Sequence, residues 1–252
     1  MDKSWTLYKD TTWDYSELSP REKLRLEALC ALLPAEVTSA LDAGCGEGRL
    51  GRSLLERKSL RLISLDIVPR AAKSAPGDRL AGSVASLPLA SASVEAVIAS
   101  EVLEHLPEPV YRAALDEFAR VTQRFLLISV PFRELLDARQ ITCSACGCRY
   151  NKDWHLRRFD LPDLERLHPD FTLIETSRIA PRSPWQRLFN RARTTTSGAS
   201  PDSPCPLCGA EARANRADKF RALLLEGADS LARLEATKPT WLVALYQKKA
   251  HR

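Results

Sequence analysis

The feature that most constrains the fold is a glycine-rich turn that joins a short apolar segment to a helical one. The apolar segment covers residues 37–43, the turn GCGEG covers residues 44–48, and the helical segment covers residues 49–57. Glycines let a backbone turn tightly and let a ligand approach the main chain closely. The sequence therefore predicts a strand, a turn and a helix in succession, with a ligand held against the turn.

Further strands and helices alternate along the rest of the chain. Strands are expected at 60–67, 79–83, 94–100, 125–130, 171–179 and 241–247, and helices at 20–33, 109–121, 161–168 and 218–234. This alternation implies an α/β fold with a doubly wound, mostly parallel, seven-stranded Rossmann-like sheet. We expect a single domain in four segments: an N-terminal helical cap (1–36), a cofactor-binding core (37–131), a cysteine-rich insertion (132–160) and the C-terminal part of the sheet with a second cysteine pair (161–252).

Composition excludes some classes of protein and leaves the partner open. The chain has 252 residues, of which 44% are apolar and 27% charged, and this excludes wholesale disorder. No apolar run approaches the ~20 residues of a membrane span, and the N-terminus lacks the apolar core of a secretory signal, so we expect a cytoplasmic protein. Residues 181–252 hold 13 Lys and Arg against 6 Asp and Glu, a balance of +7. This basic third suits an anionic substrate, RNA or a membrane surface, or is simply a solvated face.

The residues around the turn indicate which ligand it binds. A dinucleotide-binding loop reads G-x-G-x-x-G, whereas Arg49 stands here in place of the third glycine. Asp42 beside the loop would repel a pyrophosphate, so a cationic ligand without phosphates, such as S-adenosylmethionine, suits the loop better. Asp66 ends the second predicted strand, 20 residues after Gly46, and an acid there accepts hydrogen bonds from ribose hydroxyls.

Two later stretches, GSVASLPL at 82–89 and SEVLEHL at 100–106, complete a pattern with the turn. Over residues 37–131 the chain resembles the class I S-adenosylmethionine-dependent methyltransferases, in particular the small-molecule branch typified by quinone-biosynthesis enzymes. The resemblance assigns the methionine and ribose portion to Gly44, Gly46 and Gly48, the ammonium to Asp42, the ribose to Asp66, the adenine to Ile67, Ser83 and Val84, and the methionine end to Ser100. The family usually has an acid where Ser83 stands, so we expect a weaker adenine contact at that position.

The seven cysteines include two C-x-x-C pairs, Cys143 with Cys146 and Cys205 with Cys208, and a glycine follows each pair. Two such pairs supply the four thiolates of a tetrahedral structural zinc site. The pairs are 59 residues apart, so the site requires two excursions from the sheet to meet in space. Cys148 and His155 are alternatives for one ligand, and unrelated reduced thiols are the competing interpretation.

Two histidines are candidate catalytic residues. Transfer of a methyl group to a hydroxyl needs a base for the hydroxyl proton, and neutral histidine is the usual choice. His155 lies in the polar stretch NKDWHLRRFD, and His105 lies in the SEVLEHL stretch; a structural role is the alternative for each. Four N-terminal aromatic residues are candidates to cover the cofactor or to anchor the N-terminus: Trp5, Tyr8, Trp13 and Tyr15.

These features favour a methyltransferase that acts on a hydroxyl of a small molecule, a sugar or a lipid-linked glycan. One alternative is an RNA methyltransferase that binds through the basic C-terminal region. The chain has no compact run of basic residues interleaved with aromatic ones, however, and SEVL stands where such enzymes often have an N-P-P-[YF] motif. A second alternative is a scaffold that binds S-adenosylmethionine without catalysis.

Overall fold

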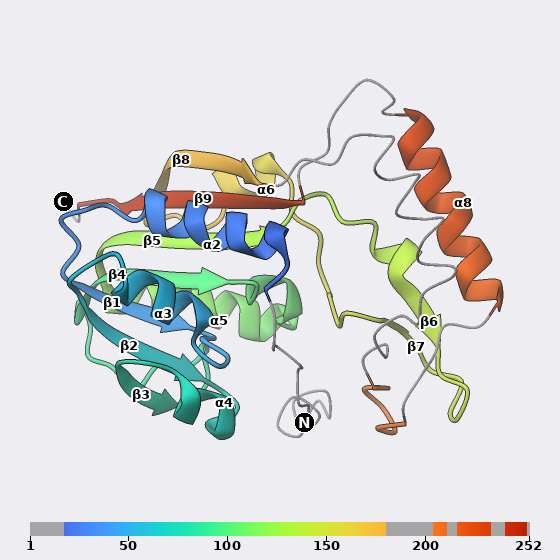
Figure 1. Cartoon of the computed structure of the whole chain (residues 1–252), viewed down its shortest axis with the longest axis horizontal. Helices are drawn as coiled ribbons and strands as arrows, with labels where there is room; N and C mark the ends of the chain where they lie inside the picture. The colour runs from blue at the N-terminus through green and yellow to red at the C-terminus, as the bar shows by residue number, and fades with distance from the viewer. Residues whose placement is uncertain (1–17, 180–203, 211–215, 233–239, 251–252) are drawn as a thin grey trace. The chain divides into compact units, whose positions relative to one another are not determined.

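The computed structural model of the chain describes residues 18–179, 204–210, 216–232 and 240–250 (Figure 1). The chain groups into two compact units. We call residues 14–132, 159–180 and 241–252 the sheet unit, and residues 1–13, 133–158 and 181–240 the cysteine unit. The four N-terminal aromatic residues named above lie outside the described residues.

The sheet unit is built on seven strands in the order β3-β2-β1-β4-β5-β9-β8. Their bounds are β1 Ser39–Ala43, β2 Arg61–Asp66, β3 Asp78–Ala81, β4 Val94–Ser100, β5 Thr122–Pro131, β8 Phe171–Ile179 and β9 Trp241–Lys248. Strands β1 to β5 pair in parallel, while β9 runs antiparallel to both β5 and β8. All seven predicted strands are present, and the predicted α/β, mostly parallel, Rossmann-like sheet is confirmed.

The helices of the sheet unit are α2 (Pro20–Leu32), α3 (Arg49–Leu55), α4 (Pro69–Ser74), α5 (Glu108–Val121), α6 (Leu161–Glu165) and the short 3-10 helix η1 (Leu103–His105). Helix α2 begins directly after Ser19, with Pro20 in its first turn. The Ser19 hydroxyl accepts a hydrogen bond from the Glu22 amide at 3.2 Å, and the Glu22 carboxylate accepts one from the Ser19 amide at 2.9 Å. This reciprocal capping satisfies two backbone donors that a helix start otherwise leaves unpaired.

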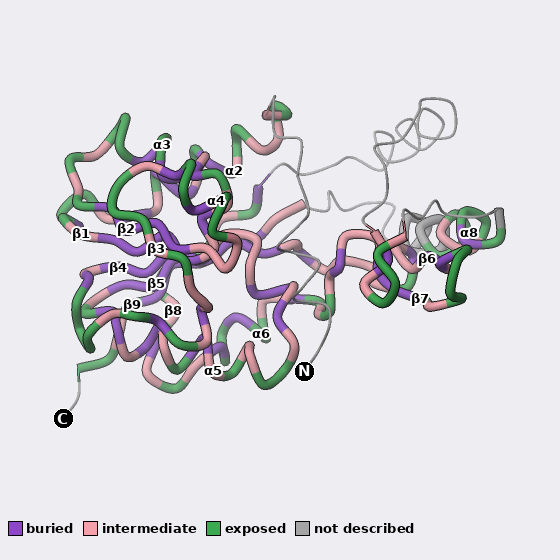
Figure 2. The backbone as a smooth tube through the Cα atoms, turned by 90° about the horizontal axis from the view of Figure 1, so that it is seen from below, coloured by how far each residue is buried: buried purple, intermediate pink, exposed green. Residues whose placement is uncertain are grey.

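The core of the sheet unit lies on both faces of the sheet. Alternate residues of a strand point to opposite faces, so Leu245 packs with helices α2 and α3, whereas Tyr246 faces the other way. The Tyr246 hydroxyl donates to the carbonyl of Leu164 in α6 at 2.9 Å, and α5 lies behind the sheet in Figure 1. The central strands are therefore buried along most of their length, as Figure 2 shows. Such double-sided burial explains their nearly continuous apolar sequences.

The chain leaves the sheet unit at one edge of the sheet. Pro131 at the end of β5 and Ile179 at the end of β8 both pair with Trp241, the first residue of β9. Phe132 and Phe159 form a parallel bridge just beyond β5. Both excursions into the cysteine unit therefore start and end at the carboxyl edge, which is the condition that the two cysteine pairs require to meet.

The described part of the cysteine unit contains the 3-10 helix η2 (Leu136–Arg139), strands β6 (Gln140–Thr142) and β7 (Arg149–Asn151), and helix α8 (Arg216–Ala232). Strands β6 and β7 form an antiparallel hairpin whose turn carries Cys143 and Cys146. The buried Asp218 carboxylate of α8 accepts a hydrogen bond from the Thr142 amide at 2.9 Å. No described helix is both long and apolar enough to cross a membrane.

Candidate functional site

The turn after β1 has the backbone conformation that its glycines allow. Gly44, Gly46 and Gly48 have φ angles of +82°, +52° and +80°, in the left-handed region that side chains disfavour. A Cβ on Gly44 would lie 2.4 Å from Val102, and one on Gly48 would lie 2.3 Å from Pro76. A Cβ on Gly46 would meet no described atom within 4 Å. Packing explains two of the glycines, while Gly46 borders open space that a ligand can enter.

Asp42 is a buried acid with an unsatisfied oxygen at this turn. Its side chain is 2% exposed, and no donor among the described residues hydrogen-bonds its Oδ2. Burial, reinforced by the nearby Asp66 carboxylate, raises the pKa of Asp42 to about 7. A buried carboxylate is costly unless it gains a cationic or hydrogen-bonding partner. Asp42 is therefore suited to a ligand that brings an ammonium group or bound water.

Asp66 lies at the end of β2 and is held by two backbone amides. Its Oδ2 accepts a hydrogen bond from Gly46, and its Oδ1 accepts one from Val68, both at 2.8 Å. Burial raises the pKa of Asp66, although these two amide bonds act in the opposite direction. Each carboxylate oxygen has a second lone pair, so the fixed carboxylate can still accept from a pair of ribose hydroxyls.

The residues predicted to border the adenine follow β2 and β3. Ile67 is half-buried directly after Asp66, and Val84 is buried. The Gly82 amide donates to the Asp66 carbonyl at 3.0 Å, which brings the start of the Ser83 turn beside the end of β2. The Ser83 hydroxyl accepts a hydrogen bond from the Ala85 amide at 3.2 Å. Ser83 is thus engaged in its own turn.

Ser100 ends β4 and belongs to a polar network that the sequence did not reveal. Its hydroxyl accepts a hydrogen bond from the Arg25 guanidinium, which lies 5.3 Å from the centre of the Trp241 ring. Trp241 Nε1 donates to the Glu101 carboxylate at 2.7 Å, and the Ser129 hydroxyl donates to the same carboxylate at 2.9 Å. Glu101 has a φ of +57°, a strained backbone of the kind found at functional sites. These contacts join α2, β4, β5 and β9 at the carboxyl edge.

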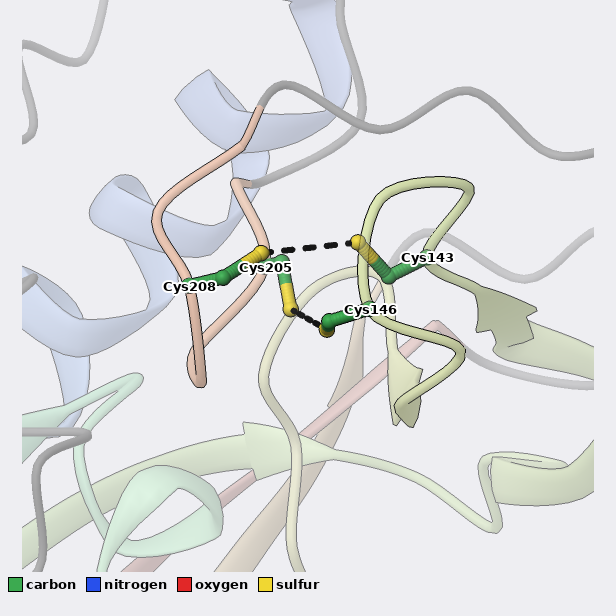
Figure 3. Close-up of side chains that lie close together, drawn as sticks. All are labelled: Cys143, Cys146, Cys205 and Cys208. Carbon is green, nitrogen blue, oxygen red and sulfur yellow. Dashed lines mark hydrogen bonds between the residues drawn. The ribbon is translucent and has the colours of Figure 1, made fainter.

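The four predicted metal ligands lie together in the cysteine unit. The Sγ atoms of Cys143 and Cys208 are 3.7 Å apart, and those of Cys146 and Cys205 are 3.6 Å apart (Figure 3). All four sulfurs lie within 4.8 Å of one another. Tetrahedral zinc with Zn–S bonds of 2.3 Å separates its sulfurs by about 3.8 Å. The thiols thus have the spacing of a four-sulfur metal site.

The two cysteine turns are near copies of each other. In each, the glycine amide donates to the carbonyl of the first cysteine, at 2.9 Å for Gly147 and 2.8 Å for Gly209, and both glycines have a φ of +73°. Amides of the first turn lower the pKa of the Cys143 thiol, whereas burial and the neighbouring cysteines raise the pKa of Cys146. Cys148 and His155 do not belong to this group of four.

His155 forms a hydrogen-bonded pair with an acid that the sequence analysis overlooked. His155 Nδ1 bonds to Oε2 of Glu134, and the two side chains are only 14% and 13% exposed. Arg139 lies 3.4 Å from the other Glu134 oxygen and also pairs with Asp153. A carboxylate on Nδ1 fixes the ring and favours the tautomer in which Nε2 is the basic nitrogen. No spacing rule links positions 134 and 155, so only the fold could reveal this pair.

Trp154, just before His155, has a φ of +57° although it is a bulky residue. For such a residue the left-handed conformation costs ~1–2 kcal/mol. His105, the other candidate base, is half-buried on η1 and belongs to the sheet unit. The two candidate histidines thus lie in different units of the chain.

The sheet order, the glycine turn, Asp42 in β1 and Asp66 at the end of β2 form the arrangement expected above from the resemblance to class I S-adenosylmethionine-dependent methyltransferases. In agreement, residues 41–124 match the family model described as a methyltransferase domain. The chain therefore contains a methyltransferase domain that takes its methyl group from S-adenosylmethionine. No curated protein matches its sequence.

Several solved structures are similar to the chain. A chain from the Haloferax volcanii complex with the Trm112 methyltransferase activator is 16% identical, with coverage of 91% of this chain and 92% of that one and a TM-score of 0.56. The Burkholderia thailandensis 1,6-didemethyltoxoflavin-N1-methyltransferase, solved with S-adenosylhomocysteine, is 17% identical over 89% and 78%, with a TM-score of 0.51. The [4+2]-cyclase SpnF is 16% identical over 90% and 82%, with a TM-score of 0.57. At these identities the likeness defines the fold alone.

Proposed function

We propose that this methyltransferase transfers the methyl group to a hydroxyl of a small molecule, a sugar or a lipid-linked glycan. The observation that carries the choice of a hydroxyl is the His155–Glu134 pair, which suits the removal of a proton from an acceptor oxygen. Amine acceptors that are already neutral need no such base.

The residues of the sheet unit fit S-adenosylmethionine. The unsatisfied Asp42 oxygen would hold the ammonium, Asp66 the ribose hydroxyls, and the open space at Gly46 would admit the ligand backbone. Ile67, Ser83 and Val84 would border the adenine, while Ser100 with Arg25 would lie toward the methionine end. When bound, the cofactor supplies a methyl group made electrophilic by its sulfonium.

In the proposed reaction, His155 acts as the general base. Glu134 accepts the Nδ1 hydrogen, so Nε2 takes the proton from the acceptor hydroxyl while the oxygen forms its bond to the methyl carbon. The electrons of the broken carbon–sulfur bond stay on sulfur, so charge and atoms balance. Along the chain, Glu134 follows Pro131, the last residue of β5, by three positions. Ligands of open α/β sheets bind beyond such strand ends. His105 on η1 is the second candidate base.

We also propose that Cys143, Cys146, Cys205 and Cys208 hold one structural zinc ion. Four thiolates from two matching turns close the coordination sphere, which leaves no position for a substrate. Metal analysis of protein purified without added zinc should give close to one atom per chain. A zero reading would refute this part of the proposal.

The methyl acceptor is tested with S-adenosylmethionine that carries a radiolabelled methyl group. The full chain is incubated with an extract of its source, which is then separated into RNA, protein, lipid and small polar fractions. We expect label in the lipid or small polar fraction, lost in the matched variant Asp42→Asn. Label in RNA would replace the proposed acceptor with the nucleic-acid alternative. Cofactor binding without transfer to any fraction would favour the scaffold alternative.

A further inference from the structure

The strained residue Trp154 lies between the two chemical groups of the cysteine unit. Its side chain is buried, at 7% exposed, among Ile141, Cys143, Tyr150 and Cys205. Its Nε1 donates to the carbonyl of Pro204 at 3.0 Å, and Pro204 directly precedes Cys205. The second cysteine turn therefore holds the indole both by packing and by a hydrogen bond.

The backbone on the other side of Trp154 leads directly to His155. The Trp154 amide donates to the Asn151 carbonyl at 2.9 Å, and the Asp153 amide donates to the Asn151 side chain at 2.9 Å. The resulting tight turn, with its left-handed residue, aims His155 Nδ1 at Glu134. A change in φ at Trp154 would rotate His155 away from this partner. Strained residues persist only where their surroundings hold them, and here the second cysteine turn is part of those surroundings.

The partner of His155 is fixed by contacts that do not involve the cysteines. Arg139 approaches Glu134 and pairs with Asp153, and its carbonyl accepts a hydrogen bond from Lys152 at 2.9 Å. These residues belong to η2 and the turn after β7. Glu134 is therefore expected to stay in place when the second cysteine turn is released, while His155 depends on Trp154.

We propose that the four-cysteine metal site positions His155, with Trp154 as the link and Glu134 as the acceptor of its Nδ1 hydrogen. Trp154 and Glu134 are thus positioning residues for the base, an inference that rests on the proposed function. Bound metal secures Cys205 beside Cys146, and the adjoining Pro204 then holds the indole. Loss of the metal frees the second turn, Trp154 relaxes from the left-handed region, and His155 leaves Glu134. The metal site would in this way control whether the base can act in methyl transfer, although the metal itself does not contact the substrate.

The test measures histidine exposure rather than methyl transfer. The full chain, loaded with zinc or stripped by a chelator, is treated at one pH with diethyl pyrocarbonate, and modification is followed by peptide mass spectrometry. His168 is the internal control, because its side chain is 11% exposed and bonds to Asp116 at 3.1 Å in the sheet unit. We expect zinc removal to speed the modification of His155 by about tenfold and to leave His168 unchanged.

A substitution of Trp154 distinguishes the effect of its hydrogen bond to Pro204 from the effect of metal binding. Trp154→Phe keeps an aromatic ring but removes the donor to Pro204, so His155 should react faster although zinc remains bound. Trp241→Phe is the matched control, since it removes a tryptophan donor in the sheet unit and should not affect His155.

An unchanged rate at His155 after zinc removal would overturn the proposal, as would an equal rise at His168, which would signal general unfolding. A chain that protects His155 in this way yet transfers no methyl group would refute the proposed function and leave the link between metal and histidine intact.

Discussion

The sheet unit and the cysteine unit are stabilised by different means. The sheet unit buries apolar side chains from seven strands and from helices on both faces. In the described part of the cysteine unit, the largest buried cluster has five members, and two of them are the metal-site cysteines Cys143 and Cys205. A small apolar cluster supplies little stability and usually needs a cross-link or a metal. The comparison teaches where each unit should be sensitive: we expect the proposed cofactor site to depend on apolar packing, and the proposed geometry around His155 to depend on the cysteine site.

Loss of one cysteine ligand should give the largest effect. It should disrupt the cysteine unit and leave cofactor binding by the sheet unit intact. Cys205→Ser removes a thiolate from a site of a kind that contributes ~10–16 kcal/mol to folding. We expect zinc content to fall from one per chain to near zero, with cofactor affinity in the sheet unit kept. Cys148→Ser is the matched control, because Cys148 lies outside the group of four and should leave the metal bound. Metal analysis measures the zinc content of the two variants, and calorimetry measures their cofactor affinity. A loss of cofactor binding in Cys205→Ser would contradict the view that the two units depend on different interactions.

The next largest effect concerns pH and acts on the sheet unit. Folding raises the pKa of Asp42 from about 4 to about 7, so between these values the folded chain binds a proton that the unfolded chain has released. The free energy of unfolding of the cofactor-free protein should therefore fall as pH rises from 4 to 7, by up to about 4 kcal/mol. Asp66, whose pKa is also raised, adds to this slope.

Bound cofactor should change this dependence, because an ammonium beside Asp42 favours the carboxylate. Affinity should rise as pH increases from about 6 to about 8, and the fall in unfolding free energy should flatten. Scanning calorimetry between pH 5 and 8, with and without S-adenosylmethionine, measures both. In Asp42→Asn, the free energy of unfolding should lose most of its dependence on pH. A wild-type protein that becomes more stable toward pH 8 would disprove the assignment of this dependence to Asp42.

Two glycine variants sharpen the distinction between packing and ligand binding within the sheet unit. Gly48→Ala places a Cβ 2.6 Å from the Ala75 backbone in a left-handed conformation, so we expect a loss of about 3 kcal/mol in stability. Gly46→Ala meets no described atom and should lose only about 1 kcal/mol, yet its methyl group would occupy the space proposed for the cofactor. Chemical denaturation and cofactor titration distinguish the two, and an unaltered affinity in Gly46→Ala would argue against that placement.

The sequence predicted the sheet well because its signals are local. Ser19 and Pro20 mark the start of α2, the three glycines mark the turn after β1, and the apolar runs of β4 and β5 mark buried parallel strands. The cysteine site was predictable because C-x-x-C turns carry their own geometry. These patterns depend on residues a few positions apart, where covalent geometry limits the choices.

The rest of the site depends on contacts between distant positions. Arg25 bonds to Ser100 across 75 positions, and Trp241 bonds to Glu101 across 140, and neither pair has a sequence signature. Glu134 becomes the partner of His155 only because η2 and the β6–β7 hairpin fold back on each other. Trp154 was read as part of a polar stretch, and its positive φ could not be anticipated because tryptophan rarely adopts it.

The most direct test of the account is calorimetric titration of S-adenosylmethionine into the wild-type chain and into Asp66→Ala. Asp66 ends β2, with one carboxylate oxygen bonded to the Gly46 amide of the glycine turn and the other to the Val68 amide, so its loss should weaken binding by ~1–3 kcal/mol. Asp78→Ala is the matched control, since Asp78 pairs with Arg61 on the exposed edge strand and should leave the affinity unchanged. One site per chain, weakened only in Asp66→Ala, is the predicted result. Equal affinity in the wild type and Asp66→Ala would contradict the cofactor site described here.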